Sequence, residues 1–231
     1  MKKVILFDLG NTLINNTSIS LEAGLNELHN QLNIMYPKNN FINEGLTLFK
    51  ELYKTRNIDN IEVKFTVYLS KLLNKFNIIT RYSLDQLEEI FYDKAVVDDK
   101  IDDVIELLDF LKRKKYKIYI ISNSTFSKKV LQKTINKFNI YPYIDNLFSS
   151  SDIGYRKPDI RFLNNINELN YIDKKDMVFI GNDKNYDLEF AKNLKIDFIW
   201  YNKDNERINN DNIKNIKNYK ELLCKWGEII D

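Results

Sequence analysis

The chain has 231 residues, and its 35 Lys and Arg residues nearly balance its 33 Asp and Glu residues, which leaves a net charge of +2. This balance argues against a nucleic-acid partner, because domains that bind nucleic acid usually carry a basic surplus. A hydrophobic content of 44%, with 13% aromatic residues, is enough for a sizeable core and excludes wholesale disorder. The length allows one domain with an insertion, or two small domains.

The sequence also lacks the features of a targeted or membrane-bound protein. The first apolar run, Val4 to Phe7, ends at Asp8, whereas a signal peptide needs an apolar stretch of roughly 7–15 residues. A membrane helix needs about 20 apolar residues, and every apolar run here is far shorter. Cys224 is the single cysteine and cannot form an internal disulfide; we expect it to be a small buried apolar group in a C-terminal helix. These features predict a cytoplasmic protein without a membrane partner.

Short apolar runs that alternate with helical periodicity predict a parallel sheet. Strands of such a sheet are covered on both faces and are therefore apolar throughout. The predicted strands are residues 4–7, 118–121, 146–149, 177–180 and 196–200. The predicted helices are residues 101–111, 127–138, 160–169, 187–194 and 219–230. This alternation is typical of βαβ units, in which ligands bind beyond the carboxyl ends of the strands.

One long segment, residues 15–97, interrupts the alternation. It contains no convincing strand and shows four amphipathic helical patterns, at residues 21–32, 41–53, 65–76 and 84–91. A capping box, Ser83 to Gln86, precedes the last of them. We expect the aromatic stripes of these helices to form the core of a helical subdomain rather than a ligand site. The predicted domains are therefore an α/β core of residues 1–14 and 98–231, and a helical domain of residues 15–97.

Four polar segments contain side chains that can take part in catalysis or ligand binding, and three of these segments follow predicted strands. The segments are residues 8–12, 122–124, 154–159 and 180–187. Each segment also has a purely structural interpretation. In the same order, these are an Asp that caps a turn, a turn closed by a hydroxyl, a solvated Lys before a helix, and a polar loop that caps a helix. Four such segments in this order rarely coincide by chance, so a shared site at the carboxyl edge of the sheet is the better interpretation.

These segments resemble the four motifs of the haloacid dehalogenase-like (HAD) hydrolase superfamily. The first family motif is an Asp, any residue, a second Asp and then Gly-Thr, and residues 8–12 keep this register. Ser122 matches the strand-end Ser or Thr of the second motif, and Lys157 matches the Lys of the third motif, which often lies within Arg-Lys-Pro. Residues 181–187 match the fourth motif, a Gly followed by spaced acids. The resemblance implies a doubly wound, Rossmann-like parallel sheet.

The superfamily also accounts for the helical insertion. Its members carry a cap over the site, either between the first and second motifs or between the second and third motifs. In this chain the first gap holds the four predicted helices, whereas the second gap, from Ser122 to Lys157, is only about 35 residues long. The resemblance therefore implies a helical-bundle cap between the first and second motifs.

The resemblance implies a Mg²⁺-dependent phosphatase that acts on a small phosphorylated metabolite through an aspartyl-phosphate. Asp8 would attack phosphorus, while Lys157 neutralises charge and Ser122 binds a phosphoryl oxygen. Substrate contacts would come from the first three motifs, at Asn11, Thr12, Ser122, Asn123 and Lys157. Mg²⁺ prefers oxygen ligands. Its implied ligands are the Asp8 carboxylate, the carbonyl of Gly10, and the fourth-motif residues Asp183 and Asp187, with Asn182 as an alternative.

Two positions depart from the family pattern. Gly10 stands where phosphatases of the family carry a second Asp, which protonates the leaving group and then activates water. Such general acid–base help is typically worth 10²–10⁴-fold in rate. Asn182-Asp183 stands where Gly is usually followed directly by Asp, so either residue could occupy the metal-ligand position. The charge of a carboxylate favours Asp183 over the amide of Asn182.

Two alternatives follow from these departures. The first is carbon–halogen hydrolysis through an ester on Asp8, because dehalogenases of the superfamily also lack the second Asp, although they usually carry an aromatic residue there. The second is a catalytically weak protein that binds a phosphorylated ligand or a partner. The sequence names neither the substrate nor the oligomeric state. His29, in the first predicted cap helix, is expected to be an ordinary surface or core residue.

Overall fold

Apolar segments along the chain form a six-stranded parallel sheet in the computed structural model, which describes residues 3–54, 56–206 and 213–230. The strand order is β5-β4-β1-β6-β7-β8. The five predicted strands are confirmed as β1 (Val4–Phe7), β4 (Lys117–Ser122), β5 (Asn146–Ser149), β6 (Met177–Gly181) and β7 (Asp197–Tyr201). A short sixth strand, β8 (Lys214–Ile216), adds to the edge at β7 and was not expected from the sequence. The fold is the predicted doubly wound α/β architecture.

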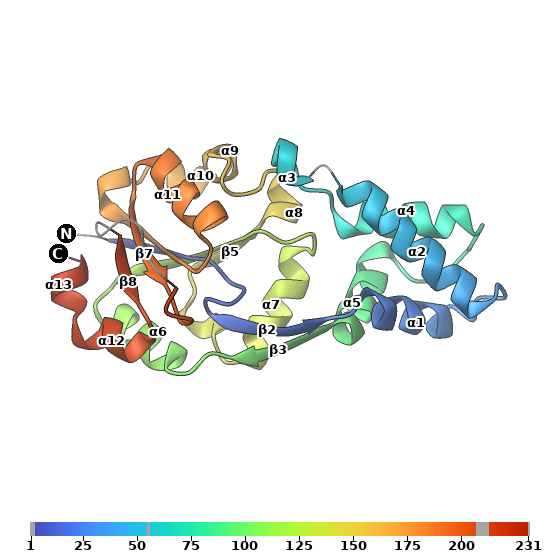
Figure 1. Ribbon diagram of the computed structural model, residues 1–231, viewed down its shortest axis with the longest axis horizontal. Coiled ribbons are helices and arrows are strands. Elements are labelled where there is room, and N and C mark those ends of the chain that lie inside the picture. Colours follow the sequence, from blue (N-terminus) through green and yellow to red (C-terminus); the bar gives the residue numbers. More distant parts are fainter. Residues whose placement is uncertain (1–2, 55, 207–212, 231) are drawn as a thin grey trace.

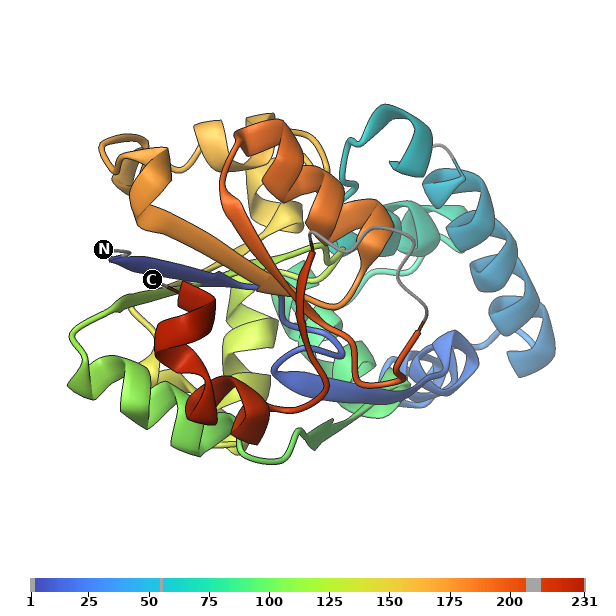
Figure 2. The same cartoon turned by 60° about the vertical axis from the view of Figure 1, so that its left-hand side comes forward.

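Helices cover both faces of this sheet (Figures 1 and 2). Successive side chains of a strand point to opposite faces, so Val4 and Leu6 pack into one apolar cluster and Ile5 and Phe7 into another. The first cluster includes side chains of α9 (Arg161–Asn164), α10 (Asn167–Asn170) and α11 (Glu189–Leu194). The second includes side chains of α6 (Val104–Arg113), α7 (Lys128–Lys137), α12 (Tyr219–Cys224) and α13 (Trp226–Ile230). Two short elements, α8 (Ser150–Ile153) and a π-helical turn (Lys184–Leu188), lie next to the predicted motifs.

Three predicted helices are interrupted in the structure. The segment 160–169 forms α9 and α10 instead of one helix, and the segment 187–194 starts with the π-helical turn. The C-terminal segment divides at Lys225, where the indole of Trp226 packs edge-on against Phe110 and Tyr116. Cys224, at the end of α12, is exposed, so the expectation that it is buried was wrong. In the part of the chain that the structure describes, no helix has the length and apolar character needed to cross a membrane.

Four helices of the insertion pack together at one end of the molecule (Figure 1). They are α1 (Leu21–Gln31), α2 (Lys38–Tyr53), α4 (Phe65–Lys75) and α5 (Leu84–Ala95), as predicted, with a short α3 (Arg56–Asp59) beside them. The capping box is present, because the backbone N–H of Gln86 donates to the Ser83 hydroxyl and the backbone N–H of Ser83 donates to the Gln86 side-chain oxygen. Phe65 is fully buried, and its ring lies 4.5 Å from that of Phe91 and 4.9 Å from that of Phe126 in the α/β part. Phe65 and Phe91 thus belong to the core, as expected, whereas Phe49 of the second stripe is only partly buried.

The expectation that residues 15–97 contain no strand was wrong at both ends of the segment. Two antiparallel strands, β2 (Ile14–Ile19) and β3 (Val96–Lys100), carry the chain into the helical bundle and back. The residues of β2 are mostly polar, and its partner strand lies about 80 residues away in sequence, so neither an apolar pattern nor a local hairpin signals the pairing. The proposed domain boundaries fall inside these two strands, and the division into domains stays a prediction.

A second connection joins the bundle to the α/β part beside the predicted motifs. Ile61 forms an antiparallel bridge with Tyr155, and Glu62 N–H donates to the carbonyl of Gly154 at 3.0 Å. The Glu62 carboxylate accepts hydrogen bonds from the Arg156 guanidinium and from the Ser150 hydroxyl, and the side chain has no exposed surface. We call this connection, Glu62 with Arg156 and Ser150, the latch.

We expect Glu62→Gln to lower the free energy of unfolding by about 3–5 kcal/mol, the usual cost of leaving one member of a buried ion pair without its partner. Urea unfolding of the purified variant measures this effect. Glu44→Gln is the matched control, since Glu44 pairs with Lys75 on the surface with nearly half of each side chain exposed. Such a surface pair contributes less than about 1 kcal/mol. Equal effects of the two substitutions would contradict the buried role of Glu62.

Candidate active site

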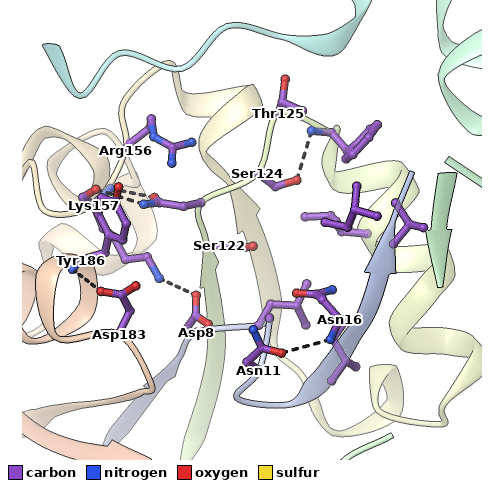
Figure 3. A pocket seen from close by; sticks show the side chains of 18 of the residues that line it. Asp8, Asn11, Asn16, Ser122, Ser124, Thr125, Arg156, Lys157, Asp183 and Tyr186 are labelled. Carbon is purple, nitrogen blue, oxygen red and sulfur yellow. Dashed lines mark hydrogen bonds and ion pairs between the residues drawn. The ribbon is translucent and has the colours of Figure 1, made fainter. Parts of the chain in front are cut away.

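The carboxyl ends of three neighbouring strands meet at one cavity. β1 lies between β4 and β6, so Asp8, Ser122 and the loop after Gly181 come together at the same sheet edge. Lys157 enters from the loop after α8, and its side chain converges with those of Asp8 and Ser122 (Figure 3). The cavity has a volume of about 560 Å³. It is lined by all the predicted site residues except Thr12, namely Asp8, Gly10, Asn11, Ser122, Asn123, Lys157, Asn182, Asp183 and Asp187.

Lys157 forms the electrostatic centre of the site. Its Nζ lies 2.6 Å from Asp8 Oδ1 and 2.7 Å from Asp187 Oδ1, and the lysine is only 1% exposed. Burial alone would lower the pKa of Lys157, but the charges of Asp187 and Asp8 outweigh burial and raise it. Lys157 therefore remains a cation that joins two carboxylates.

Asp187 is the most deeply buried carboxylate of the site, at 1% exposure. Burial raises its pKa, and the charge of Lys157 opposes this rise. Its Oδ1 accepts from Lys157, while its Oδ2 accepts from the backbone N–H of Asp183 at 3.0 Å. A Cβ at position 181 would lie 2.4 Å from Asp187 Oδ2, so Gly181 is needed to let this carboxylate approach the strand end. Both oxygens of Asp187 are thus used to orient its neighbours.

Thr12 supports Asp8 from the side away from the cavity. Its hydroxyl lies 3.2 Å from Asp8 Oδ2 and 3.2 Å from Asn182 Oδ1, and the residue is completely buried. The two oxygens of Asp8 therefore face different partners, with Lys157 at Oδ1 and the Thr12 hydroxyl at Oδ2. In this arrangement Thr12 fixes Asp8 and Asn182 relative to each other and does not itself reach the cavity.

Asn123 holds the backbone of Lys157. Its Oδ1 accepts from Lys157 N–H at 2.8 Å, and its Nδ2 donates to the Lys157 carbonyl at 3.0 Å. Both the oxygen and the nitrogen of the side chain therefore hold the Lys157 loop against the end of β4. Ser122, the preceding residue, lies beside Asp8 at the edge of the cavity (Figure 3).

The loop after Asp8 is closed by the side chain of Asn11. Asn11 has a left-handed backbone with φ of 57°, a conformation that Asn tolerates better than most residues. Its Oδ1 accepts from Asn16 N–H at 3.2 Å, which joins the start of the loop to β2 (Figure 3). This bond holds the Gly10 peptide at the edge of the cavity, next to Asp8.

Asn182 and Asp183 are both held in defined positions at the end of β6. The Asp183 Oδ1 accepts from the N–H groups of Asn185 and Tyr186, at 2.7 and 3.1 Å, and so caps the π-helical turn. The Asn182 carbonyl accepts from the indole of Trp200 at 2.9 Å, while its side-chain oxygen points to Thr12. Because Asp183 caps the π-helical turn, this turn begins at Lys184, ahead of the predicted helix at residues 187–194.

The oxygen donors beside Asp8 fit a Mg²⁺ site. Residues 3–54, 56–206 and 213–230 contain no group of three or more His, Cys, Asp or Glu side chains arranged for a metal ion. Mg²⁺ does not require such a cage, because it usually keeps several waters and takes one or two carboxylates. The candidate donors are the Asp8 and Asp183 carboxylates, the Gly10 carbonyl and the Asn182 amide oxygen, and all four residues line the cavity. These hard oxygen donors match the preference of Mg²⁺.

The cavity also contains residues that the sequence did not indicate. Arg56 comes from α3 of the bundle, with its guanidinium 3.8 Å from the Glu62 carboxylate and over the ring of Tyr53. Burial lowers the pKa of Arg56, and the charge of the nearby Arg156 lowers it further. The sequence indicates Arg156 only as the neighbour of Lys157 in an Arg-Lys-Pro sequence. The spacing of the bundle helices gives no indication that Arg56 lines the cavity. Both arginines give the end of the cavity near the bundle a positive character.

We expect Lys157→Met to make stability strongly dependent on pH in metal-free buffer. Without the cation, burial raises the folded-state pKa of Asp187 further, while its pKa in the unfolded chain stays at roughly 3.9. The folded protein then binds a proton that the unfolded chain has lost, so the free energy of unfolding falls as pH rises from about 4 through the folded-state pKa. Urea unfolding at about pH 5 and pH 8, with excess chelator, measures this slope.

Lys133→Met is the control for this prediction, because Lys133 pairs with Asp93 on the surface with about half of each side chain exposed. Its slope should match that of the unsubstituted protein. A Lys157→Met variant with the same slope as the control would show that Lys157 does not compensate the buried carboxylates.

Comparison with known proteins agrees with this geometry. The family model for haloacid dehalogenase-like hydrolases matches residues 5–201. The pyrimidine 5'-nucleotidase PynA of Streptococcus pneumoniae is 24% identical over 209 residues, which are 87% of this chain and 84% of that protein. Two solved structures share the fold at 19% identity. A HAD phosphatase from Thermococcus onnurineus has a TM-score of 0.65, and the match covers 98% of both chains. A 2-haloacid dehalogenase from Pseudomonas syringae pv. Tomato DC3000 has a TM-score of 0.67, and the match covers 98% of this chain and all of that one. The putative HAD-hydrolase YfnB from Bacillus subtilis, solved with bound magnesium, has a TM-score of 0.58 at 18% identity over 96% of this chain and 97% of that one. Since the family model spans most of the sequence, from β1 to the end of β7, the chain belongs to the haloacid dehalogenase-like hydrolases.

Proposed function

We propose that the protein is a Mg²⁺-dependent phosphatase that hydrolyses a small phosphate monoester through an aspartyl-phosphate on Asp8. The observation that carries this proposal is the position of Asp8 between a buried cation and a set of hard oxygen donors. Lys157 bonds one carboxylate oxygen, and Gly10, Asn182 and Asp183 line the cavity beside it. A dianionic phosphoryl group can approach a carboxylate only where positive charge compensates both anions.

In the first step, the Asp8 carboxylate attacks phosphorus, an oxygen–phosphorus bond forms to Asp8, and the bond to the leaving oxygen breaks. Lys157 balances the charge of Asp8 and of the phosphoryl group, and the Ser122 hydroxyl donates to a phosphoryl oxygen. In the second step, water attacks phosphorus and restores the Asp8 carboxylate. Mg²⁺, when bound, supplies further positive charge to the phosphoryl oxygens.

We expect the ion to be held by Asp8, the Gly10 carbonyl and one residue of the pair Asn182 and Asp183. Asp187 orients Lys157 and the Asp183 backbone in this proposal, because both of its oxygens accept hydrogen bonds from those groups. One carboxylate oxygen of Asp183 accepts the hydrogen bonds that cap the π-helical turn, which leaves the other oxygen available to a ligand in the cavity. Its negative charge makes it the better ligand of the two.

The substrate would be a small phosphorylated metabolite, and nucleoside 5'-monophosphates are the first to test. The support is the similarity to a pyrimidine 5'-nucleotidase over most of both chains, together with a cavity of about 560 Å³. Aromatic side chains line part of this cavity, among them Phe49, Tyr92 and Phe126, and could pack against an apolar or planar group.

Carbon–halogen hydrolysis is the alternative that the missing acid at Gly10 keeps open. In that reaction Asp8 would attack carbon, and a halide would leave without needing a metal ion. The oxygen donors beside Asp8 would then have no purpose. Metal dependence therefore separates the two reactions, and the third possibility, a weakly active binding protein, predicts neither activity.

We expect Asp8→Asn to abolish phosphate release, because an amide is too weak a nucleophile to attack phosphorus. The measurement is phosphate release from a panel of nucleoside monophosphates and aryl phosphates in Mg²⁺ buffer, with the unsubstituted protein alongside. Circular dichroism and unfolding curves check that the variant is folded. Phosphatase activity retained in folded, pure Asp8→Asn protein would falsify the assignment of the nucleophile.

We also expect excess chelator to remove the activity and added Mg²⁺ to restore it. Asp183→Ala should raise the Mg²⁺ concentration required for half-maximal activity more than Asn182→Ala does, because only Asp183 contributes a negative charge. Isothermal titration of Mg²⁺ into each variant gives a reading that is independent of turnover. A larger loss of Mg²⁺ affinity in Asn182→Ala would assign the ligand to Asn182, and full phosphate release in excess chelator would contradict the proposed metal dependence.

A further inference from the structure

The space that a side chain at position 10 would fill is already occupied. A Cβ built on Gly10 would lie 2.4 Å from the amide oxygen of Asn16, far closer than two such atoms can approach. Gly10 is the position at which the sequence departs from the acid–base pattern of family phosphatases. Asn16, from β2, therefore places an oxygen where the missing side chain would begin, and both residues line the cavity with Asp8.

Two hydrogen bonds fix the direction of this amide. Asn16 Nδ2 donates to Asp98 Oδ1 at 2.6 Å, and Asp98 is the residue directly opposite Asn16 in the β2–β3 pair. The second oxygen of Asp98 accepts from the hydroxyl of Tyr92 at 3.0 Å. Burial raises the pKa of Tyr92, so this hydroxyl keeps its proton and remains a donor. With Nδ2 committed to Asp98, the oxygen of Asn16 is the atom that faces Gly10.

The backbone around Asn16 is shaped to hold this position. Asn16 N–H donates to Asn11 Oδ1, which ties β2 to the loop after Asp8 (Figure 3). The register of the strand pair shifts directly after Asn16, a bulge of the kind that redirects a side chain out of a regular ladder. The asparagine is thus held at the cavity from three sides, by Asn11, Asp98 and the bulge.

We propose that Asn16 is a catalytic residue that orients the water for hydrolysis of the aspartyl-phosphate, a role that rests on the phosphatase function proposed above. Its amide oxygen accepts a hydrogen bond from the water, whose oxygen forms a bond to phosphorus as the bond from phosphorus to Asp8 breaks. Asp8 leaves as a carboxylate and the phosphoryl group leaves as dihydrogen phosphate, with both water protons on it. The amide takes no proton at any stage.

The same geometry gives Asn16 no part in the first step. An amide oxygen cannot protonate a leaving group, so formation of the aspartyl-phosphate depends on how readily the leaving oxygen departs. Aryl phosphates, which have good leaving groups, should therefore form the intermediate quickly, and its hydrolysis should limit their turnover. The two steps can then be separated with a single aryl substrate.

The test is steady-state and rapid-quench kinetics of Asn16→Ala on an aryl phosphate with saturating Mg²⁺. We expect kcat to fall about tenfold, the worth of one hydrogen bond, with KM falling equally and kcat/KM unchanged, because kcat/KM reports only the steps up to the release of the phenol. The phosphorylated fraction of the enzyme, trapped in acid, should rise. Asp98→Ala leaves Asn16 in place but frees its amide. It should lower kcat and KM together, with kcat/KM unchanged, to a smaller extent than Asn16→Ala.

Asn15→Ala is the matched control, because Asn15 is the neighbour of Asn16 in β2 and its side chain accepts from the exposed Lys203. It should leave kcat, KM and the trapped fraction unchanged. An Asn16→Ala variant in which kcat/KM falls together with kcat, or in which no extra phosphoenzyme accumulates, overturns the proposal while leaving the phosphatase function intact. A wild-type protein that releases no phosphate overturns both.

Discussion

The site depends on a buried lysine that is held between two carboxylates. Removing a charge from water is costly, and only close, well-directed partners offset that cost. Lys157 meets this condition because Asn123 fixes its backbone, and because Gly181 has no side chain to keep Asp187 away from the strand end. The positions of Asp8, Asp187 and the loop after β6 all follow from the need to surround this one cation.

The sequence predicted the parts of the protein whose signal is local. The five strands were visible because a strand covered on both faces is apolar throughout, and Asp8, Ser122 and Lys157 were visible because they follow a known motif spacing. The pair β2–β3 was not visible, since its residues are polar and its partners are far apart in sequence. The contributions of Asn123, Thr12 and Asp187 also needed the structure, because a motif shows that a side chain is near the site but not what it bonds.

The insertion is joined to the α/β part at two places beside the site. The antiparallel pair β2–β3 carries the chain into the bundle and back, whereas the latch joins the bundle to the α/β part through the buried Glu62 and Arg156. The latch also brings Arg56 to the cavity, so the part of the site farthest from the sheet is built by the bundle. The insertion also reaches the end of the cavity near the nucleophile, because Asn16 of β2 lies beside Gly10 and lines the cavity with Asp8.

Gly10 and Asn16 are neighbours at the point where the family motif lacks its second acid. A motif position is judged by the residue that occupies it, but chemistry depends on which atoms occupy the space around the nucleophile. Here the space next to position 10 holds an oxygen that comes from β2, and that oxygen fits only because position 10 has no side chain. The two positions are therefore physically coupled. A side chain at position 10 would need the Asn16 oxygen to move, although the bond from Asn16 to Asp98 holds this amide in place.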